Sequence, residues 1–332
     1  MKGKTLMSSN LRSDGAVSGE KFKSKIGGQA VIEGVMMRGI DKASMANRMP
    51  DGTIDLEEWE IKGGKNLPWY RKTPFIRGIF SFVTSMIDGY KCISRSADKQ
   101  MTEDDDEEMT RFEIWLNDKL GDKLMPVISG IAMILGVVLA MLLFMWAPSA
   151  LIKLIDTYII SIDPIVKNIV EGLLKIAIFI GYTAATALMN DMKRLYEYHG
   201  AEHKTIACYE HEEELTPENV KRFTRFHPRC GTSFIFLVLF ISIFINTIFR
   251  VSWESVLLRV LVKVALLPVV TGIAYELIRL AGRYDNIATR IISAPGLWIQ
   301  RITTREPAED EIECAIAALK AVIPENKEDD QW

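Results

Sequence analysis

Four stretches of the chain are apolar and long enough to cross a membrane as helices. Two of them, residues 126–147 and 232–249, contain no charged side chain. A helix of about 20 apolar residues matches the roughly 30 Å hydrocarbon core of a bilayer. These two segments therefore predict membrane-spanning helices.

Two further apolar segments carry charges. Residues 165–190 contain Lys167, Glu171 and Lys175, and residues 256–280 contain Arg259, Lys263 and Glu276. Charges near the end of a span reach the interface or pair inside the helix bundle. Because both segments alternate with the two uncharged ones, we interpret them as the second and fourth spans. The alternative is that they are buried helices of a soluble domain.

The polar region before the first span contains β-compatible patterns. Residues 29–38 are apolar and lie between glycines, which predicts a strand. Asp51 and Gly52 separate two further strand-like stretches, 43–49 and 53–61, and an Asp-Gly pair in this position is typical of a hairpin turn. A small β-rich unit is expected here.

An amphipathic helix is expected to follow the β-rich unit. Thr73 and Pro74 favour its start, because a capping residue precedes proline at the first helical position. Apolar residues then recur at helical spacing: Ile76, Ile79, Phe80, Val83, Met86, Ile87, Tyr90 and Ile93. The helix either lies in the membrane interface or packs against the β-rich unit. We interpret the acidic run at 103–108 as a solvated linker, followed by a short helix at 111–123.

Together the patterns predict a mainly α-helical, polytopic membrane protein of about four spans, with a small N-terminal β-containing unit and amphipathic helices. The expected division is a disordered N-terminus at 1–24, a β-rich cytoplasmic unit at 25–72, amphipathic helices with the acidic linker at 73–124, a four-span membrane domain at 125–280 that includes a cytoplasmic histidine loop at 190–231, and a cytoplasmic tail at 281–332.

Basic residues are distributed unevenly between the connections. The connection 148–164 holds only Lys153. The connection 191–231 holds seven basic residues: Lys193, Arg194, Lys204, Lys221, Arg222, Arg225 and Arg229. Cytoplasmic loops of membrane proteins carry the excess of lysine and arginine. The distribution therefore predicts that the histidine loop and both termini lie in the cytoplasm.

Composition narrows the compartment and the partners. The chain has 40 basic and 43 acidic residues, and its formal net charge of −3 gives no argument for nucleic-acid binding. Its four cysteines are widely spaced and form no CxxC pair, which is typical of reduced thiols. Residues 1–25 lack the apolar core of a signal peptide, so insertion is expected to use internal spans. The lipid bilayer is the first expected partner.

All four histidines lie between His199 and His227, and the first two belong to an H-x-x-E-H pattern that includes Glu202. If the second span continues as one helix to this motif, His199 and His203 differ by about 40° around the helix axis, so both can reach one ion. Glu202 lies beside them and can take a proton from a water on the ion. The pattern predicts a divalent-metal site, most simply zinc. The alternative is a pair of interfacial histidines whose rings bond to loop carbonyls.

A catalytic zinc site has three protein ligands and one open position. We expect His227, just before the third span, as the third ligand, and Glu276 near the end of the fourth span is its rival. The alternative for Glu276 is an ion pair with Arg279 or Arg283. Cys230 could close the site as a fourth ligand, which would make the site structural rather than catalytic.

Four blocks of sequence stand out: residues 27–38 (GGQAVIEGVMMR), 198–204 (YHGAEHK), 227–234 (HPRCGTSF) and 295–307 (PGLWIQRITTREP). Together they resemble the YqhQ-like family of bacterial membrane proteins. They agree in order, and the resemblance covers about residues 25–322. It implies a multi-pass protein of the bacterial cytoplasmic membrane. The family is described as uncharacterised or as predicted metal-dependent enzymes, and the second description implies a metal at the histidine motif.

Two classes of function fit these features. The first is a metal-dependent hydrolase that acts on a membrane protein or a lipid, with Glu202 as general base and with Arg38, Lys204 or Arg229 stabilising an anionic group. The second is a non-enzymatic assembly factor or scaffold with a structural His/Cys site. A transporter is a weaker third reading, because four spans are few unless the chain forms a homo-oligomer.

Overall fold

The computed structural model describes residues 22–61, 68–100, 124–249, 253–284 and 286–331. Residues 1–21 of the N-terminus expected to be disordered (1–24), the acidic run at 103–108 and the short helix at 111–123 lie outside the described residues. Contacts between the backbone segments divide the chain into two compact units. One comprises Met1–Gln100, Thr183–Ile235 and Ala274–Trp332, and the other comprises Met101–Tyr182 and Phe236–Ile273.

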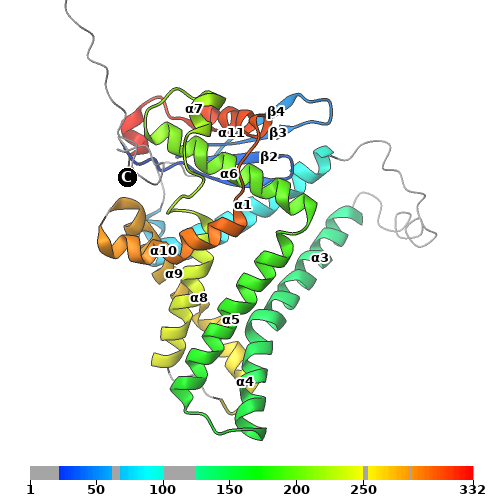
Figure 1. Cartoon of the computed structure of the whole chain (residues 1–332), viewed down its shortest axis with the longest axis vertical. Helices are drawn as coiled ribbons and strands as arrows, with labels where there is room; N and C mark the ends of the chain where they lie inside the picture. Colours follow the sequence, from blue (N-terminus) through cyan, green and yellow to red (C-terminus); the bar gives the residue numbers. More distant parts are fainter. Residues whose placement is uncertain (1–21, 62–67, 101–123, 250–252, 285, 332) are drawn as a thin grey trace, which may run out of the picture. The chain divides into compact units, whose positions relative to one another are not determined.

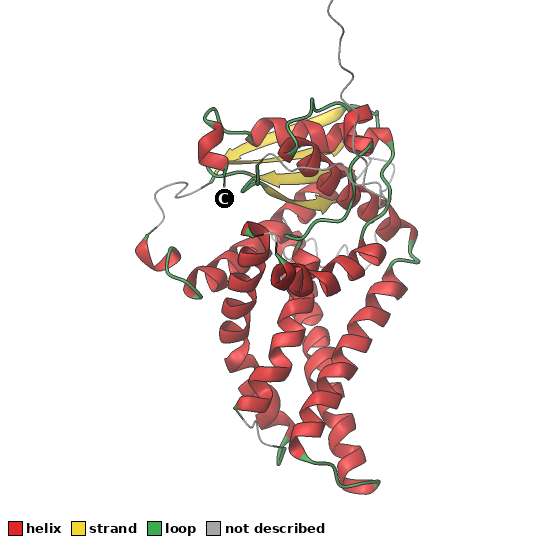
Figure 2. Cartoon of the chain, turned by 60° about the vertical axis from the view of Figure 1, so that its left-hand side comes forward, coloured by secondary structure: helices red, strands yellow, loops and turns green. Residues whose placement is uncertain are grey.

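The first unit contains a four-stranded antiparallel sheet (Figure 2). Its strands β1 (Gly27–Val31), β2 (Gly34–Arg38), β3 (Lys42–Arg48) and β4 (Ile54–Glu60) lie in chain order. The hairpin between β3 and β4 is as expected, but residues 29–38 are wrong as a single strand. Val31 pairs with Gly34, so the chain reverses at Ile32 and Glu33, and Glu33 takes a left-handed φ of 48°.

Helices cover both faces of this sheet. Helices α6 (Asn190–Glu210) and α11 (Glu309–Val322) pack on one face, where side chains such as Val35 and Met37 join their apolar residues in the main core (Figure 1). Met36 and Met45, which pair across β2 and β3, point to the opposite face and contact Cys92. Because successive strand side chains point to opposite faces, this one sheet contributes to two separate hydrophobic cores.

Cys92 belongs to α1 (Ile76–Gln100), the expected amphipathic helix, which begins after Phe75, a residue with a φ of 65°. Its small and polar face lies on the sheet: Ser96 accepts a hydrogen bond from the Ile32 amide, and Arg38 pairs with Asp88. The apolar stripe lies on the other side and is exposed at Phe80, Val83, Met86, Ile87, Tyr90 and Ile93. Packing against the β-rich unit is therefore confirmed, and contact with the membrane interface stays a prediction.

The remaining described elements of this unit are short or peripheral to the sheet. They are the 3-10 helix η1 (Trp69–Arg71), α7 (Pro217–Lys221), α10 (Ile287–Thr303) and the 3-10 helix η5 (Lys327–Asp330). Asn286 caps α10 by accepting a hydrogen bond from the Thr289 amide, while the Thr289 hydroxyl accepts one from the Asn286 amide. This reciprocal cap fixes where α10 begins.

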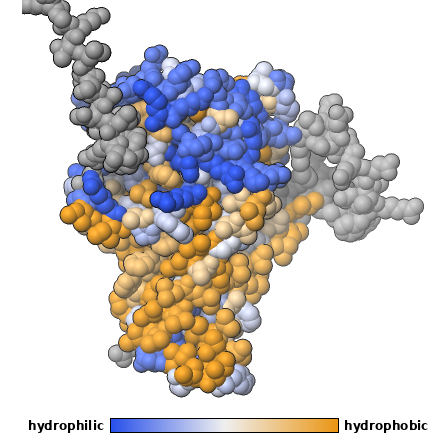
Figure 3. Space-filling view, viewed as in Figure 1, coloured by the Kyte–Doolittle hydropathy of each residue, from blue (hydrophilic) through white to orange (hydrophobic). Residues whose placement is uncertain are grey.

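Four helices among the described residues are long and apolar enough to cross a membrane, as expected. The first, Gly130–Tyr158, consists of most of α3 (Leu124–Met141), the π-helical turn η4 (Leu142–Trp146) and α4 (Ala147–Tyr158). The other three are α5 (Pro164–Thr186), α8 (Gly231–Ile248) and α9 (Val256–Arg283). Hydrophobic residues cover most of their visible surface in Figure 3. The first span runs past Pro148, because the preceding π turn shifts the hydrogen-bond pattern at the point where proline lacks its N–H.

The second span does not continue as one helix to the histidines, so that expectation is wrong. Helix α5 ends at Thr186, and α6 begins at Asn190 after Met189, whose backbone is extended at φ −70° and ψ 140°. Asp191 in the first turn of α6 favours a new helix start, because a carboxylate is stabilised by the positive end of the helix dipole. The histidines therefore belong to a separate helix that is part of the sheet-containing unit.

Candidate metal centre

Helix α6 carries His199 and His203 on neighbouring turns. Tyr198, Ala201 and Ile206 of the same helix point into the main core, which fixes how the helix is rotated on the sheet. The two imidazole rings then lie side by side, with centroids 4.4 Å apart, and His203 is 2% exposed. The spacing of four residues brings both side chains to one face, as expected from helix geometry.

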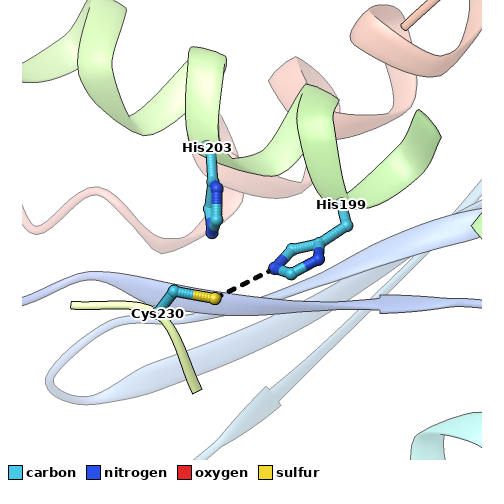
Figure 4. A group of neighbouring side chains, drawn as sticks. All are labelled: His199, His203 and Cys230. Carbon is cyan, nitrogen blue, oxygen red and sulfur yellow. Dashed lines mark hydrogen bonds between the residues drawn. The ribbon is translucent and has the colours of Figure 1, made fainter. Parts of the chain in front are cut away.

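Cys230, which precedes α8, completes a group of three potential ligands (Figure 4). Its Sγ lies 3.2 Å from Nε2 of His199, and the ligand atoms of His199, His203 and Cys230 all lie within 4.8 Å of one another. Imidazole nitrogen and cysteine sulfur are the donors that zinc prefers. In its residue types and separations this group fits a divalent metal ion.

Backbone carbonyls hold both imidazoles in one orientation. Nδ1 of His199 lies 2.8 Å from the carbonyl oxygen of Thr303, and Nδ1 of His203 lies 2.6 Å from that of Arg225. A carbonyl only accepts, so each Nδ1 carries a proton and donates it, and Nε2 is the nitrogen that remains to bind an ion once it is deprotonated. This is the outer contact that metal-binding histidines almost always make.

The two carbonyls come from segments that are fastened to each other and to α6. Arg225 donates from Nε to Thr304 Oγ1 at 3.1 Å and pairs with Glu306 at 2.7 Å. The Arg305 amide donates to the carbonyl of Tyr196 in α6 at 2.8 Å. A Cβ at Gly200 would lie 2.0 Å from the carbonyl oxygen of Arg305. Glycine inside the histidine motif therefore allows the segment that orients His199 to approach the helix.

Glu202 lies beside the two histidines and is 5% exposed. Its Oε2 has no hydrogen-bond partner among the described residues. A buried carboxylate oxygen without a partner is costly, and such atoms are typical of functional sites. Burial raises the pKa of Glu202, and the opposing effect of His203 and His199 does not cancel it. A Cβ at Gly28 in β1 would meet the Glu202 side chain at 2.9 Å, so this glycine provides the space for the carboxylate.

The group stabilises a thiolate. Burial on its own would raise the pKa of Cys230, but the facing His199 and His203 outweigh it and hold this pKa well below its ordinary value. Burial lowers the pKa of His199, and the facing Cys230 reverses the effect and raises it to about 9. A thiolate is the form of cysteine that binds metal.

His227 lies next to this group rather than in it. Its ring centroid is 5.4 Å from that of His203, and its Nε2 accepts a hydrogen bond of 3.0 Å from Arg229. Its backbone is held by Gln300, which accepts from the His227 amide at 2.8 Å and donates to its carbonyl at 2.7 Å. Burial and the positive charge of Arg229 keep the pKa of His227 well below its ordinary value.

Glu276 is not part of the group formed by His199, His203 and Cys230. It accepts from Nε of Arg77 at 2.7 Å and from the Phe75 amide at 3.1 Å, so it ties the start of α1 to α9. The sequence suggested an ion pair as the alternative to ligation, with Arg279 or Arg283. The structure shows an ion pair with Arg77, which comes from a distant segment.

Three basic residues were expected as anion-binding candidates, and each has an acidic partner. Arg38 pairs with Asp88 at 2.5 Å, Lys204 with Glu306 at 2.5 Å, and Arg229 with Glu210. Of the three, Arg229 also donates to His227, whose ring centroid lies 5.4 Å from that of His203.

Comparison with known proteins confirms the resemblance seen in the sequence. Residues 73–325 match the family described as protein of unknown function (DUF1385). The chain is also 32% identical over 308 residues to the "Uncharacterized protein YqhQ" of Bacillus subtilis (strain 168), an alignment that covers 92% of this chain and 95% of the relative. No solved structure matches the chain. A family match over most of its residues and a relative aligned over nearly its whole length show that the chain belongs to the DUF1385 family of YqhQ-like proteins.

Proposed function

We propose that the protein is a membrane-bound, metal-dependent enzyme of the hydrolase class, with a divalent ion held by His199, His203 and Cys230. One observation carries the proposal: two backbone carbonyls hold both imidazoles by Nδ1, and the ligand atoms of His199, His203 and Cys230 all lie within 4.8 Å of one another. Such orientation costs conformational entropy and is expected where an ion must be bound tightly.

The residues around the group divide into roles. A zinc ion held by these residues would supply the acidity that makes a water molecule reactive near neutral pH. Glu202 acts as general base, because its unpartnered Oε2 can accept a proton while Gly28 leaves the carboxylate room. Arg229 lies next to His227 and can offer positive charge to an anionic group of the substrate.

Three ligands favour an enzyme over a scaffold. A structural zinc site is closed by four protein ligands, whereas a catalytic one keeps a position open. His227 would be the fourth ligand of a closed His3Cys site, but its Nε2 is already taken by Arg229. The scaffold with a structural site is the second candidate and predicts that His227 turns to bind the ion.

The four apolar helices and the distribution of basic residues support a proposal for the substrate class and the location. We propose a multi-pass protein of the bacterial cytoplasmic membrane whose histidine group faces the cytoplasm, acting on a membrane protein or a lipid. The lipid bilayer is its constant partner, and a homo-oligomer is compatible with this arrangement.

Metal analysis and cobalt spectroscopy of the detergent-purified protein test the ligand set. We expect about one equivalent of zinc in the wild type and a loss of most of it in His203→Ala. Co²⁺ bound to the apo-protein should show a thiolate charge-transfer band that Cys230→Ala abolishes. Cys208→Ala is the matched control, because Cys208 is also buried but lies in the main core. Wild-type protein that neither retains nor takes up zinc would refute the proposal.

Two further variants separate the enzyme from the scaffold. Glu202→Gln should keep the metal and the Co²⁺ spectrum but fail to complement a deletion strain, because an amide cannot accept the proton. His227→Ala should leave the metal content unchanged in the enzyme and lower it strongly in a His3Cys scaffold. Full complementation by Glu202→Gln would favour the scaffold.

A further inference from the structure

Helix α10 has the opposite polarity to a helix on the surface of a soluble protein. Its exposed residues include three large apolar side chains: Ile287 is 78% exposed, Ile291 67% and Trp298 50%. Its buried residues are small or polar apart from Ile299, and they are Thr289, Ser293, Gly296, Ile299, Gln300 and Thr303. A helix whose apolar side faced only water would lose the free energy that burial normally provides. An apolar partner is therefore expected to cover this side of α10.

The exposed apolar residues of α10 form one continuous stripe. At about 100° per residue, Ile287, Ile291, Ala294 and Trp298 fall within about 60° of the helix circumference. Ala294 is exposed like the three larger side chains. Apolar stripes on a protein surface mark contacts with membranes or with partner proteins. The position and the charge of α10 favour the membrane.

Helix α10 is attached to the ends of two membrane-length helices of the same unit. Helix α9 ends at Arg283, and α10 begins only four residues later (Figure 1). A Cβ at Gly296 would lie 2.4 Å from Cβ of Ser233, in the first turn of α8. Gln300 also donates to the Ser233 hydroxyl at 2.9 Å. A membrane-spanning helix begins and ends near the membrane surface, so a helix attached at both places is suited to lie in that surface.

The composition of α10 suits the headgroup region of a bilayer. The helix contains no acidic residue and two basic ones, Arg290 and Arg301. Both arginines are exposed, and their angles place them on the same edge of the apolar stripe. Arginine side chains beside an apolar face extend to lipid phosphates, and tryptophan is enriched at the same depth. The charge of α10 is therefore complementary to that of lipid phosphates.

Helix α1 of the same unit shows the same inverted polarity. Its apolar stripe is exposed, whereas its buried residues are Gly78, Gly89, Cys92 and Ser96. The ring of Phe82 packs on that of Phe234 in α8, with centroids 5.7 Å apart. A Cβ at Gly78 would lie 2.6 Å from Cβ of Tyr275 in α9. Two inverted helices thus contact the same ends of α8 and α9, as expected where a membrane surface covers both.

We propose that α10 lies in the membrane interface, with Ile287, Ile291 and Trp298 in contact with lipid acyl chains and with Arg290 and Arg301 beside the headgroup phosphates. Helices of this kind bury their apolar side about 5–10 Å into the boundary between headgroups and acyl chains.

The opposite side of α10 contacts the candidate metal centre. Its Thr303 carbonyl accepts the hydrogen bond from Nδ1 of His199, and its Gln300 side chain accepts from the His227 amide. Lipid and the histidine group therefore lie on opposite sides of one helix. This placement does not require a bound metal.

Photo-crosslinking of the full chain in proteoliposomes of phosphatidylglycerol and phosphatidylcholine identifies what covers the stripe. Benzoylphenylalanine is introduced at Ile291 and, in a control protein, at Glu60, an exposed residue at the end of β4. We expect mass spectrometry to detect several-fold more phospholipid adduct at the first position than at the control. A crosslinked dimer without lipid adduct would show that a second copy covers the stripe. Equal adduct at both positions would show no preference for the stripe, and either result would overturn the proposal.

A carboxylate placed in the stripe tests the same contact through stability. Ile287→Asp and Ala288→Asp add one charge at the first two positions of α10, so both gain alike from the positive end of the helix dipole. Ala288 is exposed but lies about 100° away from Ile287, at the edge of the exposed face. We expect Ile287→Asp to lower Tm in proteoliposomes by several degrees relative to Ala288→Asp, because a charge among acyl chains is costly.

Equal Tm values for the two aspartate variants would mean that Ile287 faces water and would overturn the proposal. If Ile287→Asp does not fold, the crosslinking result decides, because it uses a chain without an added charge. Neither measurement involves metal binding or complementation. The placement of α10 is therefore tested separately from the proposed enzyme.

Discussion

The four cysteines differ in their surroundings although all are buried. Burial raises the pKa of Cys92, raises that of Cys208 to about 12 and raises that of Cys314 to about 11. Cys230 is the exception, because His199 and His203 outweigh the effect of burial and lower its pKa. At neutral pH a thiolate is therefore expected at Cys230 and thiols at the other three positions.

This difference predicts selective modification of the metal-free protein. A small permeant reagent such as methyl methanethiosulfonate should label Cys230 first, and the rate should change little between about pH 6 and pH 9 because the thiolate is already formed. Labelling of Cys208 should be slow and should rise with pH. Peptide mass spectrometry after timed quenching measures both rates, and added zinc should protect Cys230. Faster labelling of Cys208 than of Cys230 would contradict the charge assignment.

At the scale of single residues, the sequence predicts only part of the candidate metal centre. The spacing of His199 and His203 is sufficient to place both on one helical face, whatever the helix packs against. The third member of the group depends on the path of residues 225–230. Cys230 rather than His227 completes the group, because Gln300 and Arg225 hold that loop. The carbonyls that orient the rings have no signal in the sequence, because every residue has one.

At the scale of elements, the contact between β1 and α6 determines the surroundings of Glu202. Gly27 and Gly28 are neighbours in β1, but a Cβ on Gly27 would meet nothing within 4 Å. A Cβ on Gly28 would lie 2.8 Å from the carbonyl oxygen of Met36 and 2.9 Å from the Glu202 side chain. The two glycines therefore provide a matched pair for testing how closely the strand must approach the helix.

Gly28→Ala should displace Glu202 or push β1 away from the helix, at a cost of about 1–3 kcal/mol in stability. We expect complementation to fall strongly while metal content stays near that of the wild type, because the substitution touches none of the three proposed ligands. Gly27→Ala should behave like the wild type in both measurements. If Gly28→Ala complements fully and is as stable as the wild type, Glu202 does not need its present position.

The sequence does not predict the ends of elements that depend on contacts with residues far away in the chain. The reversal at Ile32 and Glu33 contains no glycine, and Glu33 keeps its left-handed backbone because Arg194 and Tyr198 of α6 bind its carboxylate. The break before α6 is only weakly signalled, since Ala187, Leu188 and Met189 are good helix formers although Asp191 favours a new helix start. The four apolar helices are predicted well, because length and hydropathy alone define them.

At the scale of the whole molecule, one sheet core is built from segments that are far apart in sequence. Strands near the N-terminus, α6 from the middle of the chain and α11 from the tail share the same apolar cluster. Hydrophobic periodicity indicates which face of each element is buried but not which elements share a core. The resemblance to the YqhQ-like family is specific, because its blocks lie in separate parts of the chain: β1, α6, the segment around Cys230 and the end of α10.

The excess of basic residues between the second and third spans predicts that this connection lies in the cytoplasm and the connection after α4 outside. Single cysteines at two exposed positions, Glu214→Cys and Ser161→Cys, test this arrangement in intact cells with an impermeant maleimide. The native cysteines are buried, and the wild type serves as the background control. Ser161→Cys should react in intact cells, whereas Glu214→Cys should react only after permeabilisation. The reverse pattern would place the metal centre outside the cytoplasm and would contradict the assigned orientation.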